Sequence, residues 1–146
     1  MPVQQSATKL DEIIENLEYL DEWEDRYRYL IELGRSLEPL DPAAYNDANK
    51  VRGCVSQVWL ETRLARAGNG SPILHWKGDS DAHIVRGLIA LILALYSGQE
   101  AARIPAIDAN CLFERLGLST HLTPQRSNGV RAMVERIKAD ARATAA

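Results

Sequence analysis

The residues with the clearest capacity for chemistry surround Cys54, in the stretch Asn-Lys-Val-Arg-Gly-Cys-Val-Ser-Gln-Val-Trp at positions 49–59. A cysteine acts as a nucleophile in its thiolate form, and a nearby Lys or Arg favours that form. Lys50 and Arg52 supply positive charge just before the cysteine. Gly53 adds conformational freedom and leaves no side chain in the path of an approaching partner. This setting predicts a reactive thiol at Cys54.

A buried structural thiol is the alternative for Cys54, because unpaired cysteines are often fully buried. The residues that follow alternate in polarity, and they predict a strand over 55–64 with Val58, Leu60 and Leu64 on one face. If this alternation is continued back by one residue, Cys54 has the parity of Val58 and Leu60. This alternation predicts that the Cys54 side chain points toward the core, on the same face as Val58 and Leu60.

Other side chains that could take part in chemistry form no metal-binding pattern. His75, His83 and His121 lack the spacing of a zinc site, which normally needs three or four converging ligands. Asp79 and Asp81 flank the start of a predicted helix. Acids in that place commonly cap free N–H groups, so capping explains both without a catalytic role.

Two further residues, Arg126 and Cys111, have chemically capable side chains. Arg126 falls in the first turn of the predicted last helix, where a cation opposes the helix dipole. This position favours a role in binding an acid or an anion, and a surface salt bridge is the alternative. Cys111 lies beside Leu112 and Phe113 in a predicted short helix, which favours packing in the core.

Composition is that of one ordinary globular domain. The chain has 146 residues, 46% hydrophobic and 25% charged, which is enough for a single core. A net charge of −3 opposes binding to nucleic acid or to an anionic membrane, since both need a basic face. We find no signal peptide, and the longest apolar run, 88–96, is too short to span a bilayer. Two cysteines make no disulfide scaffold, so we expect a cytoplasmic protein with free thiols.

Periodicity predicts an α+β fold over residues 1–146, with a small antiparallel sheet of about three strands packed against several helices. Predicted helices cover 8–19, 22–33, a central apolar segment through 84–95, a short segment at 110–116 and a last helix from 123. Predicted strands cover 55–64 and 73–77 around a turn at 68–71, with a short strand near 50–52. We expect residues 1–7 and 140–146 to fray.

The predicted helices have recognisable end signals. Thr8 and Asp21 are expected to cap the first two helices, and Gly34 to end the second. Thr123 is expected to cap the last helix, with Pro124 at its first position.

Several segments together resemble the SufE/CsdE family of sulfur-acceptor proteins, and this resemblance covers most of the chain. They are Gly-Cys-x-Ser-Gln-Val-Trp at 53–59, Gly-Asp-Ser-Asp at 78–81, His-Leu-Thr-Pro-x-Arg at 121–126, Trp-Glu-Asp-Arg-Tyr at 23–27 with Leu-Gly at 33–34, and Ile-Val-Arg-Gly-Leu-Ile-Ala at 84–90. Val55 departs from the pattern, because a polar residue, often Gln, commonly follows the cysteine in this family.

The resemblance implies that Cys54 accepts sulfur as a persulfide from a pyridoxal-phosphate cysteine desulfurase, stimulates that enzyme and passes the sulfur on to a scaffold or other recipient for iron–sulfur cluster assembly. It implies a fold similar to that of the U-type iron–sulfur scaffolds, with a resting cysteine that swings out to react. The residues implied to support the cysteine loop or to contact the partner are Lys50, Arg52, Gly53, Gln57, Asp79, Asp81, His121 and Arg126. No cofactor or metal is expected beyond the transient persulfide. The sequence does not separate a Suf-type from a Csd-type partner, and it leaves a homodimer open.

An iron–sulfur scaffold and a cysteine-dependent hydrolase or thiol peroxidase are the two alternative function classes. An iron–sulfur scaffold needs about four ligands, mostly cysteine thiolates, and the chain offers one suitably placed cysteine. A cysteine hydrolase or thiol peroxidase would need a base near the nucleophile, and His121 could serve Cys54 in that role. Turnover of ester or peroxide substrates would distinguish this class from a carrier.

Overall fold

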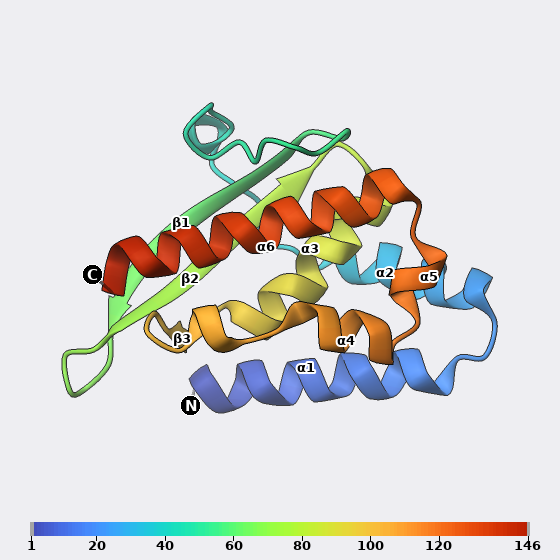
Figure 1. Ribbon diagram of the computed structural model, residues 1–146, viewed down its shortest axis with the longest axis horizontal. Helices are drawn as coiled ribbons and strands as arrows, with labels where there is room; N and C mark the ends of the chain where they lie inside the picture. The colour runs from blue at the N-terminus through green and yellow to red at the C-terminus, as the bar shows by residue number, and fades with distance from the viewer. Residues whose placement is uncertain (1, 146) are drawn as a thin grey trace.

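The computed structural model describes residues 2–145 of the chain, with side chains from residue 9 onward. Its elements are α1 (Pro2–Tyr19), α2 (Trp23–Arg35), η1 (Pro42–Ala44), β1 (Val58–Arg66), β2 (Pro72–Ser80), α3 (His83–Tyr96), β3 (Gln99–Glu100), η2 (Ile104–Ala106), α4 (Ala109–Arg115), α5 (Leu118–His121) and α6 (Pro124–Ala145). The three strands form an antiparallel sheet in the order β1-β2-β3, with helices packed against it (Figure 1). The predicted α+β class is confirmed.

The hairpin of β1 and β2 follows from its turn residues. The amide of Ala67 donates a hydrogen bond of 2.9 Å to the carbonyl of Ser71, and Gly70 adopts a φ of +86° that favours glycine. The two strands pair from Val58 opposite Ser80 to Arg66 opposite Pro72. The turn prediction is therefore confirmed.

The predicted strand boundaries are partly wrong. β1 begins at Val58 instead of residue 55, and β2 continues to Ser80 instead of ending at residue 77. Residues 55–57 alternate in polarity, but the Gln57 amide is bound by the side chain of Asp81 and not by a neighbouring strand. The short strand expected near residues 50–52 is a single bridge between Lys50 and Trp59.

Helices α3 and α6 cover the same face of the sheet. Leu60 and Leu74 are buried there. Gly78 allows α3 to approach closely, since a Cβ at this position would lie 2.7 Å from Cγ2 of Ile89. Leu64 shares this face, as predicted from its parity, yet it is 54% exposed. Leu64 lies on the edge strand β1, whereas its partner Leu74 on the central strand β2 is 1% exposed, so the face is covered more fully over β2 than over this end of β1.

Two glycines allow α2 and α3 to cross at backbone contact distance. A Cβ on Gly87 of α3 would lie 2.1 Å from the carbonyl oxygen of Leu30, and one on Gly34 of α2 would lie 2.6 Å from the amide nitrogen of Gly87. Gly34 lies inside α2, which ends at Arg35, so its predicted role as a helix stop is wrong. It is a glycine because the partner helix leaves no room for a side chain.

The predicted helix caps meet different outcomes. Helix α1 begins at Pro2 and so contains Thr8, and α2 has Glu22 and not Asp21 at its N-cap, without a capping side-chain bond. These two predictions are wrong. The prediction for α6 is confirmed, because Pro124 is its first residue and the Thr123 hydroxyl accepts a 3.2 Å bond from the amide of Arg126.

Helix α6 is bound to the sheet at its far end. The Asp140 carboxylate accepts bonds from the Thr62 hydroxyl at 2.7 Å and from the Trp76 indole N–H at 3.3 Å. Ala141 is fully buried. The described chain is helical through Ala145 and from Pro2 onward, over the stretches where the sequence led us to expect fraying.

Elements that the sequence did not predict are the shortest ones, β3, α5 and the two 3-10 turns.

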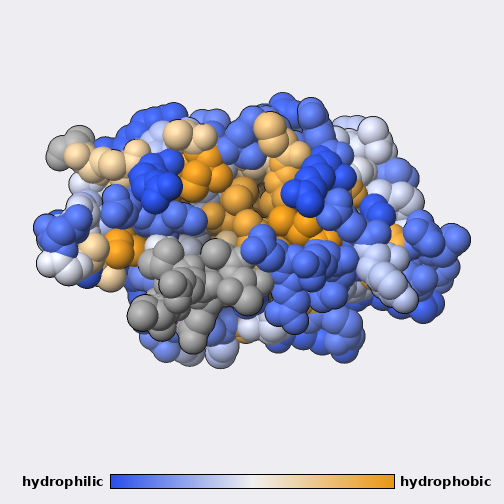
Figure 2. Space-filling view, turned by 90° about the horizontal axis from the view of Figure 1, so that it is seen from below, coloured by the Kyte–Doolittle hydropathy of each residue, from blue (hydrophilic) through white to orange (hydrophobic). Residues whose placement is uncertain are grey.

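Seen from the side of α1, apolar residues gather near the centre of the surface between polar margins (Figure 2). Ile13, Ile14 and Leu17 of α1 face the core. No helix within residues 2–145 is long and apolar enough to cross a membrane.

Candidate functional site

Cys54 lies in an irregular loop, residues 52–57, that precedes β1 and is here called the cysteine loop. Gly53 has a φ of +93°, a conformation that side-chain-bearing residues rarely adopt, so the predicted need for glycine at this position is confirmed. Because β1 starts at Val58, the strand parity used to orient Cys54 does not apply. The thiol is nevertheless half-buried, for a different reason.

The thiol is sheltered by α6 and not by the sheet. Its Sγ atom lies 3.7 Å from the carbonyl oxygen of Gly129, and a Cβ on Gly129 would lie 3.6 Å from that sulfur. A separation of 3.6 Å is an ordinary van der Waals contact, so the thiol packs against Gly129 but does not require a glycine there. The sequence alone does not mark Gly129 as a neighbour of Cys54. The available signal was this glycine in the middle of a helical pattern.

Cys54 borders a largely apolar cavity of about 300 Å³, here called the cysteine cavity. Its walls come from the cysteine loop, the first turns of α3 and the first half of α6. The lining residues are Cys54, Val55, Ser56, Val58, Val85, Leu88, Thr123, Gln125, Arg126, Gly129 and Met133. The structure thus brings Arg126 to Cys54, in agreement with the resemblance.

Arg126 is half-buried at this cavity. Within the side chains that the structure describes, none of the ion pairs involves it. The surface salt bridge considered from the sequence is therefore not formed there. A guanidinium in no ion pair with the described side chains, at the wall of a largely apolar cavity, is suited to hold an anion.

Both ends of the cysteine loop are fixed by hydrogen bonds. Before it, the amide of Val51 donates to the carbonyl of Val58 at 2.8 Å. After it, the amide of Gln57 donates to the Asp81 carboxylate at 3.0 Å, and the amide of Asp81 donates back to the Gln57 carbonyl at 3.3 Å. Asp81 therefore supports the loop. Its expected capping role is wrong, since Ala82 is the N-cap of α3 and no side chain caps it.

Asp79 bonds residues outside the cysteine loop, unlike Asp81. It lies in β2, forms an ion pair of 3.0 Å with Arg86, and accepts a bond from the hydroxyl of Tyr45. That bond raises the pKa of Tyr45. The Tyr45 ring in turn packs edge-on against Trp59 at a centroid distance of 5.0 Å. Asp79 thus ties the segment before the cysteine loop to the sheet, and it is not a helix cap.

The two cations before the cysteine do not activate it in this conformation. Arg52 is exposed, and Lys50 is half-buried beside Trp59 in the isolated bridge. Burial raises the pKa of the Cys54 thiol above its ordinary value of 9.0, and no charge counteracts this. The resting thiol is therefore mostly protonated at neutral pH.

This raised pKa predicts a pH profile. In a Cys111→Ser background, we expect the rate at which iodoacetamide alkylates Cys54 to increase about tenfold per pH unit, because the thiolate fraction does so below the pKa. The increase should continue past pH 9.0, the ordinary pKa of the group. Mass spectrometry of timed samples measures the rate. A plateau near neutral pH would mean that Lys50 and Arg52 stabilise the thiolate after all.

His121 is held away from the cysteine cavity. Its ring stacks on Trp23 at a centroid distance of 3.6 Å, and its Nδ1 atom lies 3.0 Å from the carbonyl oxygen of Gly117. Arg26 lies over the Trp23 ring at 4.8 Å. His121 is the last residue of α5 and does not line the cavity of Cys54. Its contacts join α5 to α2.

Cys111 is not a core residue, so that prediction is wrong. It is exposed on α4, and its thiol donates to the Asp108 carboxylate at 3.3 Å. This bond raises the pKa of Cys111 and lowers that of Asp108. On a short amphipathic helix the apolar neighbours Leu112 and Phe113 face inward and Cys111 faces solvent.

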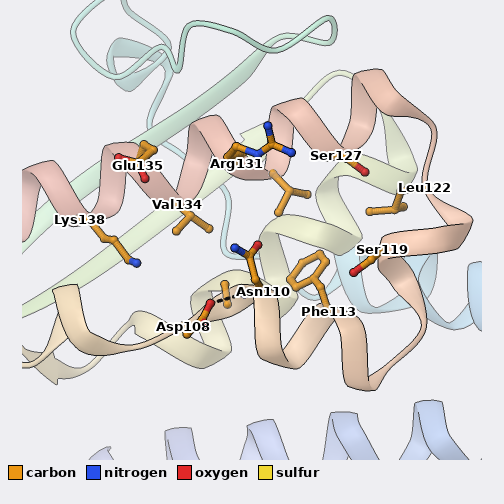
Figure 3. Close-up of a pocket in the computed structure, with 12 residues that line it drawn as sticks. Asp108, Asn110, Phe113, Ser119, Leu122, Ser127, Arg131, Val134, Glu135 and Lys138 are labelled. Carbon is orange, nitrogen blue, oxygen red and sulfur yellow. Dashed lines mark hydrogen bonds between the residues drawn. The ribbon is translucent and has the colours of Figure 1, made fainter.

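A second cavity, of about 200 Å³, lies between α4 and α6 (Figure 3). Phe113, Leu122 and Val134 supply apolar walls, and charged residues such as Arg131 and Lys138 stand at its edge. Cys54 is not among its lining residues. Within the described side chains, no group of three or more His, Cys, Asp or Glu is arranged to hold a metal ion.

Comparisons with known proteins agree with this geometry. Residues 11–141 match the family model described as SufE, Fe–S metabolism associated domain. An uncharacterized SufE-like protein of Rhizobium meliloti is 52% identical over 134 residues, which cover 92% of this chain and 95% of the relative. One of Rhizobium etli is also 52% identical, over 137 residues that cover 94% and 92% of the two chains. The chain therefore belongs to the SufE family, whose members are associated with iron–sulfur metabolism.

Proposed function

We propose that this protein is a cytoplasmic sulfur acceptor and carrier. In this proposal, Cys54 takes persulfide sulfur from a pyridoxal-phosphate cysteine desulfurase, and the protein stimulates that enzyme and passes the sulfur on for iron–sulfur cluster assembly. The observation that carries the proposal is the position of Cys54. It is the thiol of an irregular loop that follows a glycine, and it borders a largely apolar cavity whose wall also contains Arg126. Membership of the SufE family supplies the context.

The proposed step is an exchange between thiol and persulfide. The Cys54 thiolate attacks the terminal sulfur of the partner's persulfide, a new S–S bond forms at Cys54, the partner's S–S bond breaks, and its thiolate leaves. The electron pair of the broken bond goes to the leaving sulfur, so no outside oxidant or reductant is needed. The proton of the resting thiol must be lost before the attack.

The resting structure suits storage better than attack. A half-buried thiol with a raised pKa is a poor nucleophile, so Cys54 reacts only after its loop turns toward the partner. Once loaded, the persulfide is anionic more readily than a thiol, and Arg126 is the cation at the cavity that would pair with it. The apolar walls would meanwhile keep other thiols away from the carried sulfur.

Neither alternative function is favoured by a specific observation. For a hydrolase or peroxidase, His121 would have to reach Cys54, but its ring is stacked on Trp23 outside the cysteine cavity. For an iron–sulfur scaffold, the second cysteine, Cys111, would have to share a cluster with Cys54. It lies on α4, does not line the cysteine cavity and is bound to Asp108.

The proposal is tested by locating the transferred sulfur. The protein is incubated with a cysteine desulfurase and free cysteine, and intact-mass and peptide mass spectrometry follow. We expect the mass of added sulfur on the peptide that contains Cys54, and the Cys111→Ser variant should acquire it equally. Sulfur found on Cys111 instead would contradict the assignment, as would protein that acquires none.

A further inference from the structure

Val55, directly after the reactive cysteine, is an apolar residue whose side chain is exposed to solvent, which is unfavourable. It is 81% exposed, while its neighbour Cys54 is half-buried against Gly129. Val55 nevertheless borders the cysteine cavity at the loop. The loop therefore holds a small polarizable side chain inside and a larger apolar one outside, beside a space with apolar walls.

The loop is built so that these two side chains can exchange. Cys54 and Val55 are adjacent but differently exposed, since the thiol is half-buried and the valine is 81% exposed. Gly53, at a φ of +93°, precedes them and tolerates backbone conformations that other residues do not. The bonds at Val51 and Gln57 hold both ends of the loop, so the middle can turn without releasing its anchors.

The cavity has the size and the lining to receive the valine. Its volume is about 300 Å³, and Val58, Val85, Leu88 and Met133 supply apolar walls. Cys54 is part of the cavity wall, so its departure without replacement would enlarge the cavity and uncover more apolar surface, which is unfavourable. Burying an exposed valine is favourable. An inward turn of Val55 would therefore offset the loss of the thiol's contacts.

We propose that Val55 is a positioning residue that exchanges places with Cys54. When the thiol turns outward, Val55 enters the cysteine cavity, which raises the population of the reactive conformation. The exchange itself is a property of the free protein, and its use in sulfur transfer rests on the function proposed above. The chemical requirement at position 55 is thus an apolar side chain that the cavity can accept.

Alkylation of the free protein tests this exchange, because iodoacetamide reads the population of outward Cys54. Val55→Gln and Val55→Ile are compared in a Cys111→Ser background at one pH. We expect Val55→Gln to slow alkylation of Cys54 about tenfold, since an amide is costly to bury where a valine is favoured. Val55→Ile should retain the parent rate or exceed it. Equal rates in the glutamine and parent proteins, or a faster rate in the glutamine protein, would overturn the proposal.

A pH profile separates positioning from a change in the thiol itself. If Val55 acts on the population of conformers, Val55→Gln should lower the alkylation rate by the same factor at every pH below the pKa. A factor that varies with pH in that range would overturn the positioning role. Failure of this proposal is distinct from failure of the proposed function: sulfur mapped to Cys54 with equal alkylation rates refutes the exchange alone. Slowed alkylation with no acquired sulfur refutes the function alone.

Discussion

Replacing Cys54 with serine should abolish sulfur acceptance and return the desulfurase to the turnover it shows without an acceptor. A serine hydroxyl is far less acidic than a thiol and cannot form the S–S bond that holds the transferred atom. The expected loss is at least about a hundredfold in persulfide formed at position 54, since the step has no other chemical route. The readouts are alanine release by the desulfurase and the mass of the acceptor.

This substitution should spare the fold, so that the loss can be assigned to chemistry. Serine is slightly smaller than cysteine, so it fits the half-buried position beside the Gly129 carbonyl without a clash. We expect the free energy of unfolding in urea to change by less than about 1 kcal/mol. Cys111→Ser is the matched control, and it should stimulate the desulfurase as the parent does. Stimulation retained by Cys54→Ser would show that docking alone accounts for activation.

Replacing Gly87 with alanine should produce the largest loss of stability among single-methyl changes in the crossing of α2 and α3. The new Cβ would lie 2.1 Å from the backbone oxygen of Leu30, and a backbone atom cannot move aside as a flexible side chain can. We expect the free energy of unfolding to fall by about 3 kcal/mol or more. Alanine's helix preference, about 1 kcal/mol over glycine, offsets only part of this cost.

Gly68→Ala is the matched control for this substitution. No atom lies within 4 Å of a Cβ built at Gly68, and this glycine does not have a positive φ. We expect its free energy of unfolding to remain within about 0.5 kcal/mol of the parent. Urea denaturation followed by circular dichroism measures both variants. If Gly87→Ala unfolds at the same urea concentration as Gly68→Ala, the close crossing of α2 and α3 does not exist in solution.

The parts of the fold that the sequence predicted are those with a repeated local signal. The apolar positions of α3 recur at helical spacing, and the glycine-rich turn at 68–71 separates two alternating segments. The end of β2 was missed because Gly78 and Asp79 look like a turn locally. Their strand conformation depends on pairing with Leu60 and Trp59 across the sheet.

The sequence singled out residues of the candidate site but did not predict what surrounds them. Cys54 and Arg126 were recognised from their residue types and context, and the structure brings them to one cavity. The role of Gly34 could not be predicted. A single sequence does not distinguish a glycine that ends a helix from one that lets a neighbouring helix pack closely. The shelter of Cys54 by Gly129 is likewise a contact between distant segments, so no local pattern contains it.

The position of α6 has a consequence for the protein during its own synthesis. The ribosome makes the cysteine loop well before it makes the helix that shelters the thiol. That helix is bound at Asp140 and Ala141, near its far end, so its docking waits for those residues to leave the exit tunnel. Every newly made molecule thus passes through a stage in which the sulfhydryl is open to oxidants and cellular electrophiles, and the docking of α6 ends that exposure.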